Sequence, residues 1–567
     1  MSRAEMKALG WDELDVLLVS GDAYVDHPSF GTALIGRWLQ FNGYRVGIVA
    51  QPRWNIPEDI MRLGRPRLFA GVTAGALDSL LAHYTAFRKL RHDDAYTPGN
   101  RHGARPNRAC IVYTGLVRQA FPGLPVVLGG VEASLRRAVH YDFWTDKMRR
   151  SLLLDSKADL LVYGMGERAV LEAARRLENT PEGVKPAEAL RGIPGTAFAV
   201  SKLDGILPDG EEPVTLPGLA EITADPKALM TATLALERQV HQGTRWAVQD
   251  NGGRQVVFTP PAAPLDTAEM DALHGMPFTR RQHPLHREPV PAARMIQFSI
   301  TAHRGCAGGC TFCSITLHQG RQIQSRSAAS LLDEARTLTR HPDWAGSISD
   351  VGGPTANMWG ARCALGPASC RRTDCLTPKV CPHFKTDDAG LVGLLRDMAE
   401  LDGVRHLRVA SGVRYDLDGG DGVYLRALVN EFVGGQLKVA PEHTSDKVLR
   451  LMRKPAFQRF EAFLELFAAA SCEAGREQYV IPYLISAFPG CTDDDMRGLA
   501  AWLKQRGWRP RQVQCFIPTP GTVATAMYHA GIDPKGTPLP VARTDAERIR
   551  QHRILMPLES GEPREMG

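Results

Sequence analysis

The sequence predicts an α/β protein built from two successive parts: a doubly wound parallel sheet, and then a partial barrel of six strand–helix units, (β/α)6. Five short apolar runs early in the chain alternate with helical periodicity and end in glycine turns, a pattern typical of a doubly wound sheet. Six further strand-like runs in the second half each lead into a polar or glycine-rich loop. A chain of 567 residues is also too long for a single core.

The N-terminal part is expected to span residues 1–199. Its predicted strands are residues 15–20, 45–50, 68–72, 125–130 and 159–163. We expect a helix to begin at Asp26-His27-Pro28, with Asp26 as its cap. Ligands of such sheets bind at the carboxyl ends of the strands, here near Gly21, Gly129-Gly130 and Gly164.

Between residues 200 and 292 the pattern becomes irregular, with frequent proline, glycine and aspartate, and we expect a linker segment with one helix at 226–241. The stretch 277–286 is basic and carries two histidines. A solvated linker that crosses the next domain is the favoured interpretation, and a strip that closes over an anionic substrate is the alternative.

The barrel part is expected to span residues 293–530. Its predicted strands are residues 295–301, 347–351, 405–410, 436–440, 479–485 and 512–517, with helices between them that include 391–401, 424–432 and 446–473. The active site of such a barrel lies on the loops that follow the strands. Residues 531–567 have weak periodicity and are expected to form a partly ordered tail.

The loop after the first barrel strand carries three cysteines, Cys306, Cys310 and Cys313, in C-x3-C-x2-C spacing among glycines. Soft thiolates select iron–sulfur clusters, zinc or copper(I). A [4Fe-4S] cluster held by three cysteines leaves one iron open for reaction. The alternative is a structural zinc loop that takes a fourth ligand from elsewhere in the chain.

A second group of cysteines lies in an insertion at residues 361–385, after the second barrel strand. Its members are Cys363, Cys370, Cys375 and Cys381, and His383 follows them. Their spacing suits four thiolates on one metal, either zinc or a second iron–sulfur cluster, and reduced free thiols are the alternative. Arg371-Arg372 would offset the negative charge of such thiolates.

Several long blocks of sequence resemble the YgiQ-type radical S-adenosylmethionine (radical SAM) proteins, over nearly the whole chain. These blocks are 129–137, 140–144, 155–159, 162–167, 318–321, 324–327 and 352–357. The resemblance implies a [4Fe-4S] cluster on the three-cysteine loop, and S-adenosylmethionine that is cleaved to methionine and a 5′-deoxyadenosyl radical. It also implies a cobalamin-binding-like N-terminal domain before a radical SAM barrel. The resemblance implies no particular substrate.

The resemblance also suggests which residues hold S-adenosylmethionine. Radical SAM enzymes place a glycine pair after the second strand, here Gly352-Gly353 followed by Pro354 and Thr355, against the methionyl group. Ser411, Arg414 and Glu442, with Gly490, occupy loops where such barrels contact the rest of the cofactor. An ordinary glycine turn is the alternative for the pair. The cobalt-ligating motif Asp-x-His-x-x-Gly is missing from the sequence, and His27 beside Asp26 has the wrong spacing, so cobalamin is disfavoured.

Composition limits the remaining functions. The net charge of +6 and an aromatic content of 7% give no strong footprint for nucleic acid. No apolar run reaches the roughly 20 residues that span a bilayer, so we expect a cytoplasmic protein that does not enter the membrane. A radical SAM enzyme would take electrons from a donor such as flavodoxin or ferredoxin and act on a substrate that the sequence does not identify. The alternative class is an iron–sulfur redox sensor or binding protein without turnover.

Overall fold

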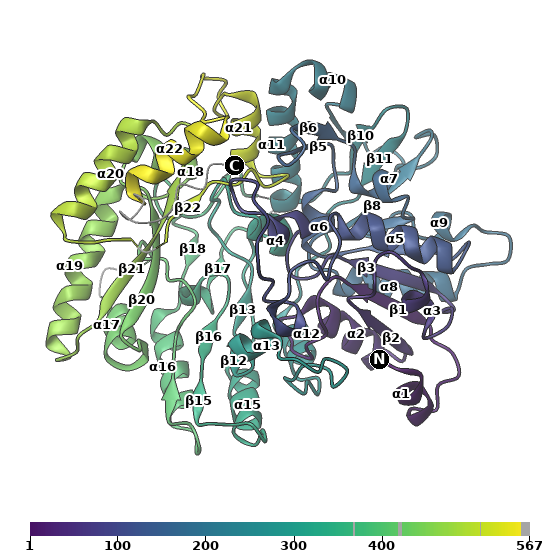
Figure 1. Ribbon diagram of the computed structural model, residues 1–567, viewed down its shortest axis with the longest axis horizontal. Coiled ribbons are helices and arrows are strands. Elements are labelled where there is room, and N and C mark those ends of the chain that lie inside the picture. The colour runs from purple at the N-terminus through teal and green to yellow at the C-terminus, as the bar shows by residue number, and fades with distance from the viewer. Residues whose placement is uncertain (367–368, 418–421, 511, 557–567) are drawn as a thin grey trace.

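The structure is a computed structural model that describes residues 1–366, 369–417, 422–510 and 512–556. Its N-terminal half contains one nine-stranded sheet with the order β2-β1-β3-β4-β7-β8-β11-β10-β9 (Figure 1). The strands are β1 (Val16–Ser20), β2 (Val46–Ala50), β3 (Phe69–Thr73), β4 (Val126–Leu128), β7 (Leu160–Val162), β8 (Thr196–Val200), β9 (Val214–Leu216), β10 (Ala247–Asp250) and β11 (Gln255–Phe258). The five predicted strands form the parallel half of this sheet.

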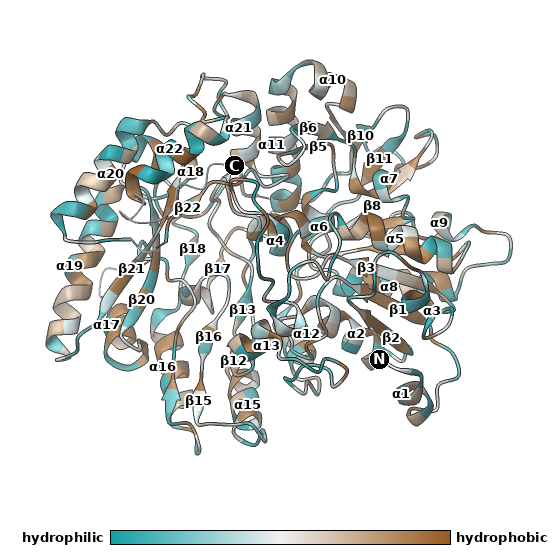
Figure 2. Cartoon of the chain, in the orientation of Figure 1, coloured by the Kyte–Doolittle hydropathy of each residue, from teal (hydrophilic) through white to brown (hydrophobic). Residues whose placement is uncertain are grey.

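Helices cover both faces of this sheet, as a doubly wound fold requires. On one face, helices α2 (Gly31–Phe41) and α8 (Glu167–Glu178) pack Leu39 and Ala173 against β1 and β7. On the other face, α5 (Ala109–Ala120) and α7 (Leu152–Ser156) bury Tyr113 and Leu153. The strands between them are apolar along their length, which Figure 2 shows in brown for β1 and β3. Two-sided burial explains why these strands lack alternation in sequence.

The segment 200–292 differs from the irregular linker that the sequence predicts. It supplies strands β9 to β11, which continue the sheet through antiparallel pairs of β8 with β11 and of β11 with β10. It also forms helices α10 (Leu219–Ala224), α11 (Pro226–Gln242) and α12 (Thr267–His274). The strands have only three or four residues each, too few for a periodic pattern to stand out between proline and glycine turns.

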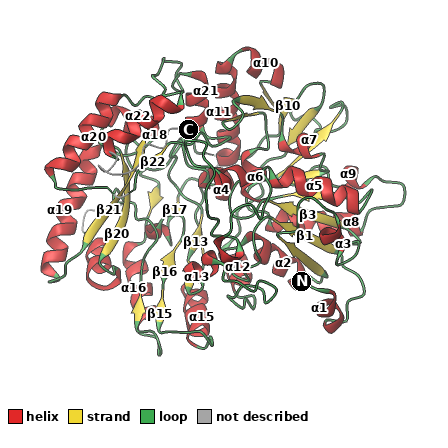
Figure 3. Cartoon of the chain, viewed as in Figure 1, coloured by secondary structure: helices red, strands yellow, loops and turns green. Residues whose placement is uncertain are grey.

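The second part contains parallel strand pairs arranged as an open barrel. The strands are β12 (Ser299–Thr301), β15 (Ser347–Ile348), β16 (Asp350–Gly352), β19 (His406–Leu407), β20 (Gln436–Glu442), β21 (Tyr479–Ser486) and β22 (Gln514–Cys515). The first predicted strand is shorter than expected, because α13 (Pro291–Ile296), with proline at its first position, occupies its start. Figure 3 shows helices, in red, around the outside of the yellow strands.

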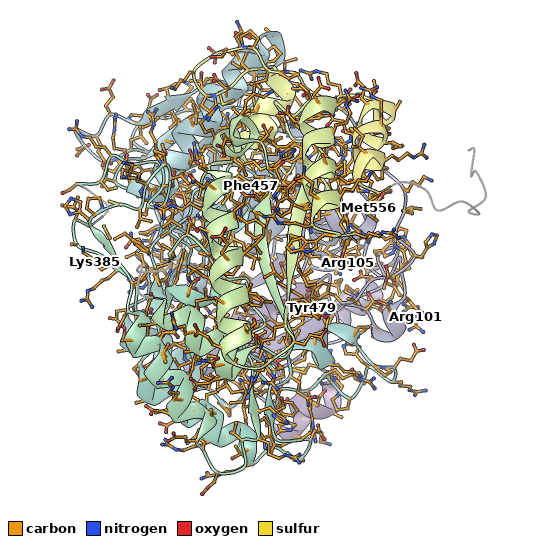
Figure 4. All side chains as sticks on the ribbon, turned by 90° about the vertical axis from the view of Figure 1, so that its left-hand side faces the viewer. Arg101, Arg105, Lys385, Phe457, Tyr479 and Met556 are labelled. Carbon is orange, nitrogen blue, oxygen red and sulfur yellow. The ribbon has the colours of Figure 1, made fainter. Side chains whose placement is uncertain are left out.

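The barrel helices bury two adjoining hydrophobic clusters. They are α15 (Ala328–Thr339), α16 (Asp388–Ala399), α17 (Val423–Ala427) with a π-helical turn Leu428–Phe432, α18 (Asp446–Met452), α19 (Phe457–Glu473), α20 (Asp493–Gln505) and α21 (Val523–Ala530). The long helix predicted at 446–473 is two helices, because Pro455 interrupts it before Phe457. Figure 4 looks onto α19, with Phe457 labelled at its start.

The segment after residue 530 is better ordered than the predicted tail, as far as the structure describes it. Helix α22 (Asp545–Leu555) begins with a capping box formed by Thr544 and Glu547. Its Arg548 is fully buried and donates hydrogen bonds to the carbonyl oxygens of Ala86 (2.9 Å) and Phe516 (2.6 Å). This arginine therefore connects α22 to both the N-terminal part and the barrel part of the molecule.

Asp26 and His27 do not start a helix. Helix α2 begins at Gly31, and the Asp26 carboxylate instead accepts hydrogen bonds from Arg37 (2.7 Å) and from the backbone N–H of Thr279 (2.8 Å). His27 is fully buried, with its ring bonded to the Ser29 N–H (3.0 Å) and to Arg280 (3.0 Å). Both side chains hold the 277–286 stretch against the N-terminal domain, so His27 has a structural role here.

Candidate functional site

A cavity of about 570 Å³ lies between the two parts of the molecule. From the N-terminal sheet it is lined by loops at strand carboxyl ends, including Gly129, Gly130 and Gly164. From the barrel it is lined by residues that follow β12 and β16, including His303 and Gly353. Ligand sites were predicted at both of these edges, and the fold turns the two edges toward the same space.

Gly21, the remaining strand-end glycine expected near a ligand, has a packing role instead. A Cβ at this position would lie 2.2 Å from the carbonyl oxygen of Ala74, so a side chain would displace the backbone of the next loop. Its neighbour Asp22 lines the cavity, buried beside Arg105 (Oδ1–Nη1 2.8 Å). Burial raises the pKa of Asp22 to about 6, although Arg105 opposes the shift. Asp22 is thus a titratable group on the cavity wall.

A buried ion pair closes one side of the cavity. Arg304, at the end of β13 (His303–Arg304), lies 2.6 Å from Glu167, the first residue of α8. Both side chains are at most 6% exposed. A buried charge is stable only when it is paired, so this contact fixes the cysteine-bearing loop, which starts after Arg304, against the N-terminal domain.

The three-cysteine loop is held at several points along its backbone. The Thr311 N–H donates to the Met452 carbonyl (3.1 Å), and the Ala524 N–H donates to the Thr311 carbonyl (2.9 Å). Arg453 reaches the Gly309 carbonyl at 3.3 Å. Cys306, Cys310 and Cys313 are half-buried with free thiols. The loop is therefore fixed by α18 and α21 although it has no regular secondary structure of its own.

Positive charge faces the thiols of this loop. The Arg414 guanidinium lies 3.7 Å from the Cys310 sulfur, and two contacts with Asp416 (2.8 and 2.6 Å) hold it there. Burial raises the pKa of Cys310, while Lys454 and Arg414 oppose the shift. Burial and the neighbouring thiols raise the pKa of Cys313 to about 12. The two cations would stabilise thiolates that have lost their protons to a metal.

The loop after β16 reaches the same cysteines. The Thr355 hydroxyl lies 3.5 Å from the Cys306 sulfur, and Thr355 is buried. Asn357, two residues further, exchanges hydrogen bonds with the backbone of Arg414 (2.9 Å each way). The structure therefore places Thr355 and Arg414 beside the cysteines.

The glycine pair contributes a close packing contact. A Cβ on Gly353 would lie 2.6 Å from the His303 carbonyl oxygen and 2.7 Å from its ring, and one on Gly352 would lie 2.7 Å from the Ser411 hydroxyl. Gly352, Gly353, Pro354 and Ser411 line the cavity. The pair thus lets the strand-end loops approach one another and leaves its backbone facing the cavity.

Two other residues predicted to contact the cofactor, Ser411 and Glu442, already interact with neighbouring side chains. Ser411 donates a short hydrogen bond to Asp350, whose carboxylate also accepts the backbone N–H groups of Ala410 and Ser411. Glu442 pairs with Lys454 (3.3 Å) at a bulge in β20, in a left-handed backbone conformation with φ of 69°. Such a conformation is rare for glutamate and is maintained only where the surroundings impose it.

His303 is a cavity residue that the sequence does not single out. It is fully buried, and neither ring nitrogen has a hydrogen-bond partner among the residues that the structure describes. Burial lowers its pKa to about 4, so the ring is neutral at physiological pH. In the sequence, His303 can be noticed only because it directly precedes Arg304 and the cysteine loop, and that position does not distinguish a cavity residue from an ordinary strand residue.

The chemistry of this loop fits a cluster better than a single ion. Within the described residues, no group of three or more His, Cys, Asp or Glu side chains converges as ligands of one metal ion. A cubane cluster instead takes each thiolate on a separate iron. A Cβ on Gly308 would lie 3.6 Å from the Cys306 sulfur and 3.3 Å from Arg414, so this glycine keeps the space between them free. The Cys306 sulfur beside that space, the two other thiols of the loop and the cations that face them fit a [4Fe-4S] cluster held by three cysteines.

The insertion lies beside the first cysteine loop. The backbone N–H of Cys375 donates to the carbonyl of Ala307 (3.0 Å), between Cys306 and Cys310. Cys375 and Cys381 are buried, Cys370 is half-buried and Cys363 is exposed. The structure thus places both predicted cysteine groups in one region of the molecule.

Comparison with known proteins agrees with this arrangement. The family described as "Radical SAM N-terminal" matches residues 1–299, and a domain of unknown function, DUF3362, matches residues 511–556. Among solved structures, the radical S-adenosylmethionine methyltransferase TsrM from Kitasatospora setae, with cobalamin and a [4Fe-4S] cluster bound, has a TM-score of 0.53. It is 16% identical in sequence, over 94% of this chain and 84% of TsrM. The fold is therefore that of a cobalamin-binding-like domain followed by a radical SAM barrel.

Curated relatives extend over almost the entire chain. A UPF0313 protein of Geobacter sulfurreducens is 51% identical over 98% of this chain and 91% of its own length. The UPF0313 protein YgiQ of Salmonella typhimurium is 46% identical over 94% of this chain and 81% of its own length. The molecule is a radical SAM protein by fold and by its N-terminal family. Within that class, it belongs to the UPF0313, or YgiQ, family.

In the part of the chain that the structure describes, no helix is both long enough and apolar enough to cross a membrane.

Proposed function

We propose that this protein is a radical SAM enzyme that holds a [4Fe-4S] cluster on Cys306, Cys310 and Cys313. The observation that carries the proposal is the meeting of three elements at this loop. Thr355 contacts Cys306 at 3.5 Å, and Arg414 lies 3.7 Å from Cys310. These two residues come from the strand-end loops where the family resemblance expects S-adenosylmethionine. When bound, cluster and S-adenosylmethionine would together supply a 5′-deoxyadenosyl radical that abstracts hydrogen.

Each residue near the cofactor has a task in this proposal. Arg414, fixed by Asp416, neutralises the thiolates. The backbone of Gly352 and Gly353 would hold the methionyl group, and Pro354 and Thr355 shape the loop beside it. Ser411 acts through Asp350, and Glu442 acts through Lys454, so both position the loops around the cofactor.

The substrate would occupy the cavity between the N-terminal sheet and the barrel. The glycine pair lines this cavity on the barrel side, and Asp22 lines it on the other. A radical generated at the barrel would thus meet a molecule held by the N-terminal domain, in a space that the Arg304–Glu167 pair helps to close. A one-electron donor such as flavodoxin or ferredoxin would supply the reducing equivalent.

The alternative class, an iron–sulfur redox sensor without turnover, needs neither a cofactor pocket nor a substrate cavity. The 570 Å³ cavity next to Gly353 favours the enzyme. His27 is buried in a structural network, which removes the nearest candidate for a histidine ligand of cobalt. The proposed enzyme therefore uses the cobalamin-binding-like domain without histidine-ligated cobalamin.

Cluster content tests the proposal. The full-length protein, purified without oxygen, is expected to contain about four irons and four sulfides that depend on the loop cysteines. Replacing Cys306, Cys310 and Cys313 with alanine should remove the paramagnetic signal of the reduced cluster, whereas Cys472→Ala, at an exposed cysteine elsewhere, should not. An undiminished signal in the triple variant would refute the assignment.

A further inference from the structure

Backbone contacts connect three of the four cysteines of the insertion. Strand β17 (Arg362–Cys363) pairs with β18 (Phe384–Lys385), which places Cys363 opposite Phe384. The N–H of Phe384 donates to the Cys381 carbonyl (3.0 Å), and the N–H of Cys381 donates to the Cys375 carbonyl (2.7 Å). Cys375 and Cys381 are both buried in one small apolar cluster. Cys363, Cys375 and Cys381 are therefore connected through these backbone contacts, and Cys370 lies five residues before Cys375.

The insertion is organised by polar contacts more than by a core. The Arg372 guanidinium donates to three carbonyl oxygens, those of Asp374 (2.9 Å), Thr377 (3.0 Å) and Lys379 (2.8 Å). The apolar cluster that includes Cys375 and Cys381 is small. Figure 4 shows Lys385, at the end of the insertion, at the edge of the molecule. A segment with so little buried apolar area needs another source of order.

An independent observation concerns Arg321, which lies outside the insertion. This residue is only 7% exposed, and none of its three guanidinium nitrogens has a hydrogen-bond partner among the described residues. Arg321 lines a pocket together with Gln242, whose side-chain amide donates a hydrogen bond to the Cys370 carbonyl of the insertion. Of the nearby acids, Glu237 pairs with Arg453 (2.5 Å), whereas Asp374 accepts hydrogen bonds from neutral donors, the Leu376 N–H (2.8 Å) and the N–H and hydroxyl of Thr377.

A buried guanidinium without a partner is costly, so its environment calls for negative charge. Neutral thiols would add nothing to the charge of Asp374, whereas four thiolates on a metal would add net negative charge. The sequence predicts that Arg371 and Arg372 offset the charge of the thiolates. In the structure, the Arg372 guanidinium donates to carbonyl oxygens and Arg371 is exposed. Arg321 is the buried cation beside the insertion whose guanidinium has no hydrogen-bond partner among the described residues.

We propose that Cys363, Cys370, Cys375 and Cys381 bind a second metal centre as thiolates, with Arg321 as its charge partner. These side chains do not converge on one ion in the described structure, and an iron–sulfur cluster would take each thiolate on a separate iron. The Cys375 N–H donates a hydrogen bond to the Ala307 carbonyl, so the second centre would also stabilise the first cysteine loop. A Cβ on Gly309 would lie only 2.4 Å from Asp374, which shows how closely insertion and loop pack. The metal is zinc or an iron–sulfur cluster, and metal analysis distinguishes them.

The first test uses the full chain in which Cys306, Cys310 and Cys313 are replaced by alanine. Because this variant lacks the first site, its metal content reports on the insertion alone, independently of the proposed function. We expect about one zinc, or an iron–sulfur cluster, per chain. Further replacement of Cys370 and Cys375 with serine should remove it, and Cys472→Ser should not. A triple variant without metal would overturn the proposal.

Thiol titration covers the case in which the serine variants fail to fold. In the folded triple variant, the four insertion thiols should resist a thiol reagent until a chelator is added. Peptide mapping of the labelled cysteines assigns the protected positions. If all four react freely before chelation, the second centre does not exist.

The second test addresses Arg321. Arg321→Met should speed the release of the second metal to a chelator by about 10-fold or more, the usual effect of losing an outer partner of a metal site. Arg321→Lys, which keeps the charge, should restore much of the retention. Arg371→Met is the matched control at an exposed arginine of the insertion and should behave like the unaltered protein. Equal rates for Arg321→Met and the unaltered protein would show that Arg321 is not the charge partner.

Discussion

Thr355 contacts Cys306 across the loops that follow two neighbouring barrel strands, with 3.5 Å between hydroxyl oxygen and sulfur. Strands β12 and β16 pair in parallel, so their carboxyl ends deliver both loops to the same place. The contact thereby links the proposed cluster loop to the loop that carries the glycine pair. A hydroxyl so placed can donate to a cluster-bound thiolate.

Removing that hydroxyl should change the cluster without destroying it. Hydrogen bonds to cluster sulfurs stabilise the reduced, more negative state, so Thr355→Val should make the reduction potential more negative. The expected shift is a few tens of millivolts, which corresponds to roughly 1 kcal/mol. Paramagnetic resonance during a redox titration measures it. Thr355→Ser keeps the hydroxyl and is the control; equal shifts in both variants would deny the bond any role.

The second prediction concerns Gly353. A side chain here would meet His303 at 2.6 Å, so Gly353→Val should displace the loop and the backbone proposed to face S-adenosylmethionine. We expect cofactor affinity to fall by about 10-fold or more, or about 1.4 kcal/mol. Equilibrium binding to the reconstituted protein measures this. Gly412→Ala, where an added Cβ would meet nothing within 4 Å, should bind normally. Unchanged affinity in the Gly353 variant would remove the pair from the site.

The cavity can be filled without straining the backbone. Gly129 lines the cavity with φ of −156°, and an added Cβ would meet nothing within 4 Å. Gly129→Leu should therefore occupy substrate space and leave cofactor cleavage in the absence of substrate within about twofold of normal. Metabolite and RNA profiles of a deletion strain that carries this variant should resemble those of the deletion itself. The control is Gly115→Leu, on the exposed side of α5. Full complementation by Gly129→Leu would place the substrate elsewhere.

A further prediction concerns the pH dependence of stability. Asp142 is fully buried and pairs with Arg108 (2.5 Å) and Arg136 (3.3 Å). Burial raises its pKa, but the Arg108 hydrogen bond and the Arg136 charge outweigh this, so the pKa lies below the usual 3.8. Its contribution is present above about pH 4 and is lost as the pH falls further. Asp142→Asn should therefore cost about 3 kcal/mol at pH 7 and progressively less below pH 4.

Denaturant unfolding at several pH values checks this prediction. Asp12→Asn, at an exposed aspartate, serves as the control and should cost little at any pH. A penalty for Asp142→Asn that stays constant down to pH 3 would contradict the ion-pair account.

The sequence was informative where one local pattern determines the structure. The apolar runs at β1 to β4 are buried on both faces, so their composition alone marks them as strands of a covered sheet. The spacing of Cys306, Cys310 and Cys313 predicts a thiolate loop, because the three cysteines are close together in the chain. Strands β9 to β11 escaped prediction because their pairing partners, not their own few residues, define them.

Long-range contacts could not be predicted in the same way. Aspartate is a favourable helix N-cap, yet the Asp26 carboxylate accepts hydrogen bonds from Arg37 and from Thr279, which is 253 residues away in the chain. Similarly, nothing local distinguishes Arg321, which is buried and has no hydrogen-bond partner among the residues that the structure describes. Side chains whose role depends on such partners are visible only in three dimensions.

Formation of 5′-deoxyadenosine is the measurement that tests the central claim most directly. The reconstituted, anaerobic protein is mixed with S-adenosylmethionine and a strong one-electron reductant, and the products are separated and quantified. The proposed function predicts that 5′-deoxyadenosine and methionine form in equal amounts, and that neither forms in the variant in which Cys306, Cys310 and Cys313 are alanine. A protein with a full, reducible cluster that forms no 5′-deoxyadenosine, with or without cell metabolites, would contradict it and favour a redox sensor.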